Sequence, residues 1–405
     1  MIQKQIKTHK LYLRARCGKM TSKNLTKQEL NRYSRHLILP EVGIKGQEKI
    51  KQGKILIIGA GGLGSPAALY LAAAGVGTIG IVDFDKVEEN NLQRQIIHST
   101  KNIGTLKTES AKNTVKGLNP NIIINLHNVK LDSKNALEIM KDYDVVIDGS
   151  DNFLTRYLVN DACVLLKKPN VYGSIFRFEG HTSVFNYDGG PCYRCLFPNP
   201  PPRNAVPNCA EAGVLGILPG VIGTIQATEA LKIILDKGDV LSGRFLVYDA
   251  LAMAFKELKL GKNKNCPICG ESPRIKELID YEEFCNMKEE EEKSLEEDEI
   301  GVKQLKEMID TNEDFILVDV REEYEWDICK IKGAKLIPLS QIMNGNIDIL
   351  ETVEKDKNIV LYCHVGARSA EALNILRSKG FKNLKNLVGG IDAWANEIDQ
   401  EISTY

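Results

Sequence analysis

Two apolar runs separated by a segment of helical length stand out in the first quarter of the chain. Residues 55–58 and 79–82 are uninterrupted apolar stretches, and an alanine- and leucine-rich segment lies between them. Unbroken runs of this kind are typical of strands that are buried on both faces of a parallel sheet. The pattern therefore predicts a strand–helix–strand unit, and a further buried strand is predicted at 144–148.

The turn between the first strand and the helix is rich in glycine. Gly59, Gly61 and Gly64 have the spacing G-x-G-x-x-G, and the second strand ends on Asp83. Glycines let a backbone approach a phosphate, the helix N-terminus offers free N–H groups, and the carboxylate can bind a ribose hydroxyl. This context favours a nucleotide-binding Rossmann-like fold over a glycine turn that only packs a helix on a strand.

A dense group of polar side chains follows Asp83. Amides and a guanidinium can hold the phosphates of a triphosphate. An NAD-dependent dehydrogenase has no special use for such a polar group beside the ribose carboxylate. Lys107 is predicted to start the next helix, where its ammonium can act as a point charge on phosphate. Each residue taken singly is a plain surface residue, but together they indicate a triphosphate site. The group consists of Asn90, Asn91, Gln93 and Arg94.

Asp151 and Asn152 come shortly after the predicted strand at 144–148. A carboxylate past the carboxyl end of a parallel strand lies on the edge of the sheet where ligands bind. Asp151 is therefore a candidate ligand for Mg²⁺. An equally natural interpretation is that Asp151 caps the predicted helix 153–166, and both roles are compatible.

The composition adds limits to this picture. A chain of 405 residues with 43% hydrophobic and 26% charged residues predicts two or three globular domains. A net charge of −1 gives no reason to expect nucleic-acid or membrane binding. We see no apolar run near the roughly 20 residues that span a bilayer and no signal-peptide pattern, so we expect a cytoplasmic protein.

Ten cysteines in a reducing compartment are expected to be metal ligands, nucleophiles or core residues. Two C-x-x-C pairs predict a closed tetrahedral zinc site with a structural role, and two redox motifs are the alternative. The zinc ligands are Cys192, Cys195, Cys266 and Cys269. A proline-dense stretch at 198–207 predicts a loop that presents Cys209, which is a candidate nucleophile.

The sharpest feature of the C-terminal part is the segment 358–381, a predicted buried strand, tight loop and helix. The strand ends on Cys363, and loop N–H groups, the helix dipole and Arg368 are expected to lower the thiol pKa and stabilise an anion. A buried structural cysteine and a phosphatase are the alternatives. Only four residues separate Cys363 from Arg368, one fewer than in cysteine-dependent phosphatases, which favours a persulfide over a phosphoryl group.

The remaining stretches set the expected domain boundaries. Residues 1–24 are basic and predict a disordered extension, and the acidic segment 276–299 predicts a linker. The domains on either side of that linker are expected at 25–275 and 300–405. Within the first of them, Thr26 and Glu29 have the spacing of a capping box and predict a helix over 26–37.

Two family resemblances rest on these motifs. The stretches RYSRHLILPEVGIKGQEKI, GAGGLGS, DFDKVEENNLQRQ, GTLK, GSDN, PCYRC, NCAEAGVLG and CPICG resemble the MoeB/ThiF/HesA adenylyltransferases, relatives of the ubiquitin-activating enzymes. DVREEYEWDICKIKGAKLIPL and CHVGARS resemble a rhodanese domain, although the family's usual histidine before the Gly-Ala turn is replaced in the region of Cys329 and Lys330. The expected fold is α/β, a Rossmann-like mixed sheet with a Cys₄ zinc site followed by a small α/β rhodanese domain.

The resemblance implies that an ATP-dependent enzyme adenylates the C-terminal Gly-Gly carboxylate of a small β-grasp sulfur carrier. A persulfide on Cys363, loaded by a cysteine desulfurase, then supplies sulfur and gives a thiocarboxylate. It implies that Arg35 reaches the partner's active site in a homodimer, and that Cys209 matches the family's crossover-loop cysteine. The expected carrier is the small subunit of molybdopterin synthase, with a thiamine-pathway carrier or a tRNA-thiolation modifier as alternatives. The residues implied for ATP and Mg²⁺ are Gly62, Asp83, Asn91, Arg94, Lys107, Asp151 and Asn152.

Overall fold

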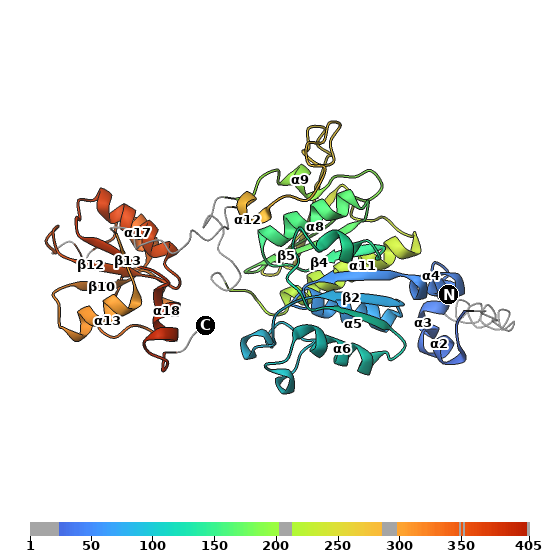
Figure 1. Cartoon of the computed structure of the whole chain (residues 1–405), viewed down its shortest axis with the longest axis horizontal. Helices are drawn as coiled ribbons and strands as arrows, with labels where there is room; N and C mark the ends of the chain where they lie inside the picture. Colours follow the sequence, from blue (N-terminus) through green and yellow to red (C-terminus); the bar gives the residue numbers. More distant parts are fainter. Residues whose placement is uncertain (1–23, 202–212, 286–297, 348–349, 351–352, 403–405) are drawn as a thin grey trace, which may run out of the picture. The chain divides into compact units, whose positions relative to one another are not determined.

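The computed structural model describes residues 24–201, 213–285, 298–347, 350 and 353–402 (Figure 1). The chain divides into two compact units. Of the described residues, the first unit contains 24–200 and 214–285, and the second contains those from 298 onward together with Pro201 and Gly213. Residues 1–23 of the expected extension, residues 286–297 of the expected linker and Cys209 lie outside the described residues.

The first unit is built on an eight-stranded sheet with the order β3-β2-β1-β4-β5-β6-β7-β8. The first five strands in this order are parallel, and β6, β7 and β8 extend the sheet in antiparallel register. This confirms the expected Rossmann-like mixed sheet. The strands are β1 Lys54–Ile58, β2 Thr78–Val82, β3 Ile123–His127, β4 Val145–Asp148, β5 Asn170–Phe176, β6 Glu179–Phe185, β7 Arg244–Asp249 and β8 Ala254–Lys259.

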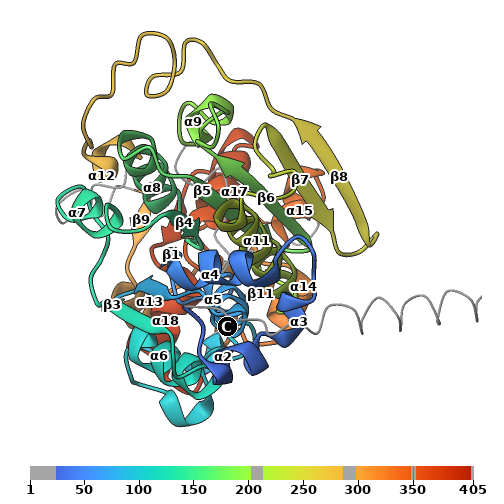
Figure 2. The same cartoon turned by 90° about the vertical axis from the view of Figure 1, so that its right-hand side faces the viewer.

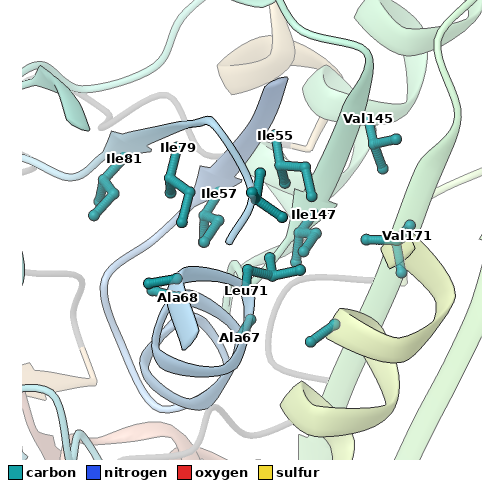
Figure 3. Packing of buried hydrophobic residues seen from close by; sticks show 14 of the residues in the cluster. Ile55, Ile57, Ala67, Ala68, Leu71, Ile79, Ile81, Val145, Ile147 and Val171 are labelled. Atoms are coloured by element: carbon teal, nitrogen blue, oxygen red, sulfur yellow. The ribbon is translucent and has the colours of Figure 1, made fainter. Parts of the chain in front are cut away.

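Helices cover both faces of this sheet because its central strands alternate between two apolar cores. Ile55 and Ile57 of β1 face α5, α6 and α11, and Figure 3 shows them against Leu71 of α5. Leu56 and Ile58 face α7 and α8 on the other side. The helices are α2 Lys27–Arg32, α3 Ser34–Leu37, α4 Gly43–Gln52, α5 Gly64–Ala74, α6 Lys107–Leu118, α7 Ala136–Met140, α8 Phe153–Leu165, α9 Tyr193–Leu196, α11 Leu218–Leu235 and α12 Tyr281–Phe284, with short 3₁₀ turns at Glu89–Asn91 and Thr100–Asn102.

The N-terminal helix begins where its capping pattern predicts. The backbone N–H of Glu29 donates to the Thr26 hydroxyl, and the Glu29 carboxylate accepts from the Thr26 N–H, which closes the capping box. The expected single helix is divided, because α2 ends before Tyr33 and α3 follows it. Tyr33 is buried, and its hydroxyl accepts a hydrogen bond from the side chain of Asn119.

One helix, α11, is long and apolar enough by length and composition to cross a membrane. It runs along the sheet beside α5 (Figure 2), and its side chains enter the core of the unit. A Cβ added to Gly223 would stand 2.4 Å from the carbonyl oxygen of Leu63, so the two helices are in close contact. The helix therefore has the environment of a core helix.

Residues 276–285, which the sequence assigned to the linker, pack on the first unit. Asp280 caps α12 by accepting from the N–H of Glu283, and the Tyr281 hydroxyl donates to the buried carboxylate of Asp161 at 2.7 Å. Polar side chains of this stretch therefore cap α12 and attach it to Asp161. The described chain resumes at residue 298 in the second unit.

The second unit has a five-stranded parallel sheet with the order β11-β10-β12-β13-β9. Its strands are short and apolar, and helices pack on both faces around two cores. This is the expected small α/β domain. Its elements are β9 Glu299–Ile300, α13 Val302–Asp310, β10 Ile316–Asp319, α14 Glu323–Trp326, β11 Lys335–Leu336, α15 Leu339–Met343, β12 Ile359–Tyr362, α17 Ala367–Ser378, β13 Leu384–Leu387 and α18 Gly390–Glu397.

Candidate functional site

The glycine turn after β1 is closed by two contacts that only glycine permits. Gly59 has a φ of +90°, and a Cβ added to Gly64 would stand 1.9 Å from the Gly59 carbonyl oxygen. Around Gly61, by contrast, the nearest atom to an added Cβ is 3.8 Å away. The turn is therefore tight at its base and open at Gly61, which is partly exposed and where a phosphate can approach the backbone, while an added Cβ at Gly62 would stand 3.1 Å from Pro219.

Asp83, at the end of β2, is tied to this turn. One carboxylate oxygen accepts from the Ala60 N–H at 2.8 Å, and the other accepts from the Asp85 N–H at 2.9 Å. Burial raises the pKa of the Asp83 carboxyl, and the charge of Lys107 opposes this rise. Lys107 starts α6, as predicted, and its ammonium lies 2.9 Å from the Asp85 carboxylate. Asp83 and Lys107 thus stand at the same edge of the sheet as the glycine turn.

The polar group after β2 is partly brought together. The Asn91 amide donates to the Asn90 side-chain oxygen at 2.6 Å, and Arg94 donates to the Asn90 carbonyl at 3.1 Å. A Cβ added to Gly62 would stand 3.7 Å from Cγ of Arg94, so the arginine stem lies beside the turn. Gln93 is exposed, and its carbonyl and side-chain oxygens lie against Gly216.

His98 supports the same turn and escaped the sequence reasoning. Its Nε2 lies 2.9 Å from the Ala60 carbonyl oxygen, and its Nδ1 lies 2.9 Å from the Ser110 hydroxyl. The carbonyl can only accept, so Nε2 carries the proton. Burial lowers the pKa of His98, which keeps the ring neutral. A single histidine in an apolar stretch gives no sequence signal for this role.

The end of β4 settles which residue caps α8. Asn152 is the N-cap, because its side chain accepts from the Thr155 N–H at 2.9 Å. The cap interpretation of Asp151 is therefore wrong, and its carboxylate is exposed, with a 3.3 Å hydrogen bond from the Asn152 amide. Asp148, three residues earlier, is fully buried and accepts from the N–H and hydroxyl of Ser150.

The ends of β1 and β4 meet at the point where the order of the strands in the sheet reverses. β1 lies between β2 and β4, and a Cβ added to Gly59 would stand 3.1 Å from the carbonyl oxygen of Gly149. Ligands of open α/β sheets bind outside the carboxyl ends of the strands at such a switch point. The arrangement offers backbone N–H groups, an ammonium and a guanidinium to a polyphosphate, and the exposed carboxylate of Asp151 to a cation.

The two C-x-x-C pairs come together as predicted, although they are far apart in sequence. The four sulfur atoms of Cys192, Cys195, Cys266 and Cys269 lie within 4.8 Å of one another. A tetrahedral Zn²⁺ with bonds of 2.3 Å separates its sulfur ligands by about 3.8 Å, so the cluster fits this ion. Hydrogen bonds between the sulfur atoms lower the pKa of Cys195 and Cys266 and raise the pKa of Cys192 and Cys269, so two of the four thiols ionise readily.

A buried ion pair fixes the first cysteine pair to α8. Arg194, between Cys192 and Cys195, donates to both oxygens of Asp161 at 2.8 Å and 3.1 Å. Its guanidinium also lies over the rings of Tyr157 and Phe284 at 4.8 and 4.4 Å. The cysteine cluster thus joins the segment after β6 to the segment after β8.

The Cys363 loop of the second unit folds around its sulfur. The Gly366 N–H donates to Sγ at 3.1 Å, and the Ser369 hydroxyl lies 3.5 Å from it. Gly366 has a φ of +104° and precedes α17, whose N-terminus faces the cysteine. Cys363 is buried, with an exposed fraction of 1%. Backbone donors and a helix N-terminus therefore surround the sulfur, which is the setting of an anion site.

The Cys363 loop is held by the start of α18, at Gly389 and Gly390, two residues that the sequence analysis did not name. The N–H groups of Ile391 and Asp392 donate to the carbonyls of Cys363 and His364 at 2.9 and 3.0 Å. A Cβ on Gly390 would stand 2.4 Å from both of these carbonyl oxygens. The carbonyl groups of Cys363 and His364 are therefore satisfied by the start of α18, and only a residue without a Cβ fits at Gly390.

Arg368 is paired with Glu325, a residue that the sequence analysis did not name. The carboxylate of Glu325 accepts from Nη1 and Nη2 of Arg368 at 2.6 and 2.7 Å. Nearby, the stretch that lacks the family histidine places Lys330 over the ring of Trp326 at 4.7 Å. Cys329 Sγ lies 3.8 Å from Nη1 of Arg321.

Two further candidates from the sequence are Arg35 and Cys209. Arg35 is exposed on α3, and Cys209 lies outside the described residues.

Comparison with known protein families gives two matches. Residues 33–268 match the ThiF family, and residues 301–397 match the rhodanese-like domain.

The relatives found by sequence span nearly the whole chain. A probable adenylyltransferase/sulfurtransferase, MoeZ of Mycobacterium tuberculosis, is 47% identical over 94% of this chain and 96% of its own length. The adenylyltransferase and sulfurtransferase MOCS3 of Culex quinquefasciatus is 43% identical over 99% of this chain and 94% of its own length.

Among solved structures, the first unit has the fold of E. coli MccB. The MccB structure with ATP aligns with a TM-score of 0.53 at 22% identity and covers 62% of this chain and 77% of that chain. The structure of PaaA aligns with a TM-score of 0.53 at 20% identity, over 65% of this chain and 84% of that chain.

Proposed function

This chain belongs to the ThiF family and carries a C-terminal rhodanese-like domain, and from this premise we propose that it activates and thiolates a small sulfur-carrier protein. It is an adenylyltransferase with a sulfurtransferase domain, as its full-length relatives are named. The observation that carries the proposal is that one chain holds a polyphosphate cradle at β1 and β2 and an anion-holding cysteine loop at β12.

In the first step, a carboxylate oxygen of the carrier's C-terminal glycine attacks the α-phosphorus of ATP. The bond between the α- and β-phosphates breaks, and pyrophosphate leaves an acyl-adenylate. Carboxylate and triphosphate repel each other, so the protein acts by positioning both and by neutralising charge. Lys107 and Arg94 serve the phosphates, Asp83 serves the ribose, and Mg²⁺ held at Asp151 supplies further positive charge.

We assign a homodimer to this step. Arg35 is exposed on α3, where it can serve the active site of a partner subunit. Two large apolar side chains that follow it, Ile38 and Leu39, are exposed by 61% and 47%, which supports burial of this segment against another chain.

In the second step, the terminal sulfur of a persulfide on Cys363 attacks the acyl carbon, and AMP leaves. The product is an acyl disulfide, and a dithiol reductant cleaves it to release the thiocarboxylate and the Cys363 thiol. The Gly366 N–H and the Ser369 hydroxyl support the persulfide anion before attack. A cysteine desulfurase is the proposed sulfur donor, and Cys209 is the candidate for a covalent role in the transfer.

The cysteine cluster has a structural role in this scheme. Zn²⁺ on four thiolates has no open coordination position, so it joins the two segments and takes no part in the chemistry. We place the enzyme in the cytoplasm, where thiols stay reduced.

The proposed carrier is the small subunit of molybdopterin synthase. A thiamine-pathway carrier and a ubiquitin-like tRNA-thiolation modifier have the same C-terminal chemistry and are the alternatives. ATP–pyrophosphate exchange, measured with each purified carrier in turn, tests the proposal. We expect exchange with one carrier that is lost when its last glycine is removed. Absence of exchange with all three carriers would contradict adenylation of this class of protein.

A further inference from the structure

Among the described residues, several buried or half-buried arginines are each held by a carboxylate, whereas Arg94, in the nucleotide cradle, and Arg156 are half-buried without one. Arg194 is held by Asp161, Arg321 by Asp319 and Arg368 by Glu325, each with contacts of 2.8 Å or less. Arg156 has no carboxylate within 4.0 Å among the described residues, although it is only partly exposed. Burying an unpaired charge is costly, so an unpaired arginine in this position indicates a missing anion.

The surroundings of Arg156 are aromatic. Its guanidinium lies 5.6 Å from the ring centres of Phe153 and Tyr172. Its one hydrogen bond in the described part of the chain is a long one, from Nη2 to the Ser150 carbonyl oxygen at 3.4 Å, and its buried Nε has no partner there. Asp148 attracts it electrostatically, but one oxygen of that carboxylate is buried without a hydrogen bond as well.

Arg156 stands next to the proposed reaction centre, on the side away from the nucleotide cradle. Ser150, which it contacts, directly precedes Asp151. The cradle is built from the ends of β1 and β2, whereas Arg156 extends from α8 towards β5, and β4 lies between these strands in the sheet. An anion bound to Arg156 would therefore reach Asp151 from the side opposite the ribose.

We propose that Arg156 binds the C-terminal carboxylate of the carrier before adenylation. This inference rests on the proposed function and names a residue for its second substrate. A planar guanidinium matches a carboxylate with two parallel hydrogen bonds, and the flanking rings exclude water that would weaken them. Adenylation removes the negative charge from this carboxylate. Arg156 therefore holds the reactant and loses its ionic hold on the product.

The test compares two forms of one carrier on the full chain. The probe is the small subunit of molybdopterin synthase, made with its natural C-terminal carboxylate and, by semisynthesis, with a C-terminal carboxamide. Calorimetry without ATP measures both dissociation constants. We expect the wild type to bind the carboxylate form roughly 10- to 100-fold more tightly, as a charge-assisted pair predicts. Arg156→Gln should bind both forms equally, with its nucleotide affinity unchanged.

The ratio of the two constants separates charge recognition from packing, because packing changes affect both forms alike. Arg274→Gln removes an exposed arginine near the cysteine cluster and should keep the wild-type ratio. Arg156→Lys keeps the positive charge but lacks the planar guanidinium, so its preference for the carboxylate form should be smaller than that of the wild type. This variant provides the test if Arg156→Gln does not fold. A preference that persists in Arg156→Gln, or that is absent from an exchange-active wild type, overturns the inference. A wild type without exchange contradicts the proposed function instead.

Discussion

The guanidinium of Arg368 is held by both carboxylate oxygens of Glu325, so the cysteine loop carries a neutral ion pair where the sequence analysis expected an arginine that stabilises an anion. Glu325 is buried, and it also accepts from the N–H of Glu322, which fixes its position. The sulfur of Cys363 therefore depends on backbone N–H groups and Ser369 for anion support. A loop without net positive charge should bind a doubly charged anion weakly.

This pairing predicts a gain of function. Replacing Glu325 with Gln frees the charge of Arg368, and we expect kcat/KM for thiosulfate to rise by roughly tenfold, mainly through KM. Transfer of sulfur from thiosulfate to cyanide measures it, and high salt should reduce the gain. Glu323→Gln, an exposed change on the same helix, is the control. An unchanged or lower rate in Glu325→Gln would show that the pair does not limit binding of the dianion.

The exposed carboxylate of Asp151 leads to the second prediction. Asp151→Ala should abolish carrier-dependent ATP–pyrophosphate exchange and leave the unfolding temperature close to that of the wild type, because Asn152 makes the helix cap. Asn152→Ala, in contrast, should lower the free energy of unfolding by about 1 kcal/mol. Exchange and thermal unfolding are measured on both variants. Exchange within tenfold of wild type in Asp151→Ala would remove this residue from the catalytic site.

The cysteine cluster predicts one zinc ion per chain. Elemental analysis of purified protein should find one equivalent, and Cys266→Ser should lower the free energy of unfolding by several kcal/mol because metal binding is coupled to folding. Cys163→Ser, a buried cysteine outside the cluster, is the matched control for metal content. Protein that folds normally with no bound metal would contradict the zinc assignment.

Cys363 should carry sulfur and should not hydrolyse phosphate. Cys363→Ala is expected to remove both thiosulfate sulfurtransferase activity and thiocarboxylate formation, while ATP–pyrophosphate exchange stays at the wild-type rate. Mass spectrometry of the wild type should find a persulfide on this residue. Cys329→Ala, in the same domain, should retain the persulfide. Rapid hydrolysis of an aryl phosphate without a persulfide would support a phosphatase instead.

Buried and half-buried histidines predict a loss of stability in mild acid. Burial lowers the pKa of His98 below the ordinary value of 6.5, and the same holds for His127, His181 and His364. Below pH 6.5 the unfolded chain therefore binds more protons than the folded chain, and stability falls as the pH falls. Each such histidine contributes a slope of at most about 1.4 kcal/mol per pH unit.

Urea unfolding of the full chain at several pH values between 5 and 7.5 measures this slope. The slope is taken from the unfolding transition of the first unit. His98→Gln should make it shallower, because Gln keeps a side-chain hydrogen-bonding group without titrating. Ser99→Ala, a change beside His98 that removes no titratable group, is the control and should leave the slope unchanged. An equal slope in His98→Gln would mean that this ring does not titrate on unfolding.

The sequence by itself determined the elements whose signals are local. Apolar runs became β1, β2 and β4, the capping box at Thr26 began α2, and the glycine spacing produced the turn that closes on Gly64. Each of these elements depends on the backbone geometry and burial of a few neighbouring residues, so the sequence pattern predicts the element that the structure shows. The four zinc-site cysteines were also predictable, since their paired spacing indicates a common ligand.

Only the tertiary structure decided which side chains meet across long separations. Glu325 and Arg368 are 43 residues apart, and either could have been a solvated surface residue by sequence alone. Both Asn152 and Asp151 have a side-chain oxygen that can accept the capping hydrogen bond. Only the tertiary structure shows that Asn152 accepts it. The unpaired state of Arg156 depends on what the neighbouring strand and helix bring to it. Charge pairing is set by distance in space, and a sequence records only distance along the chain.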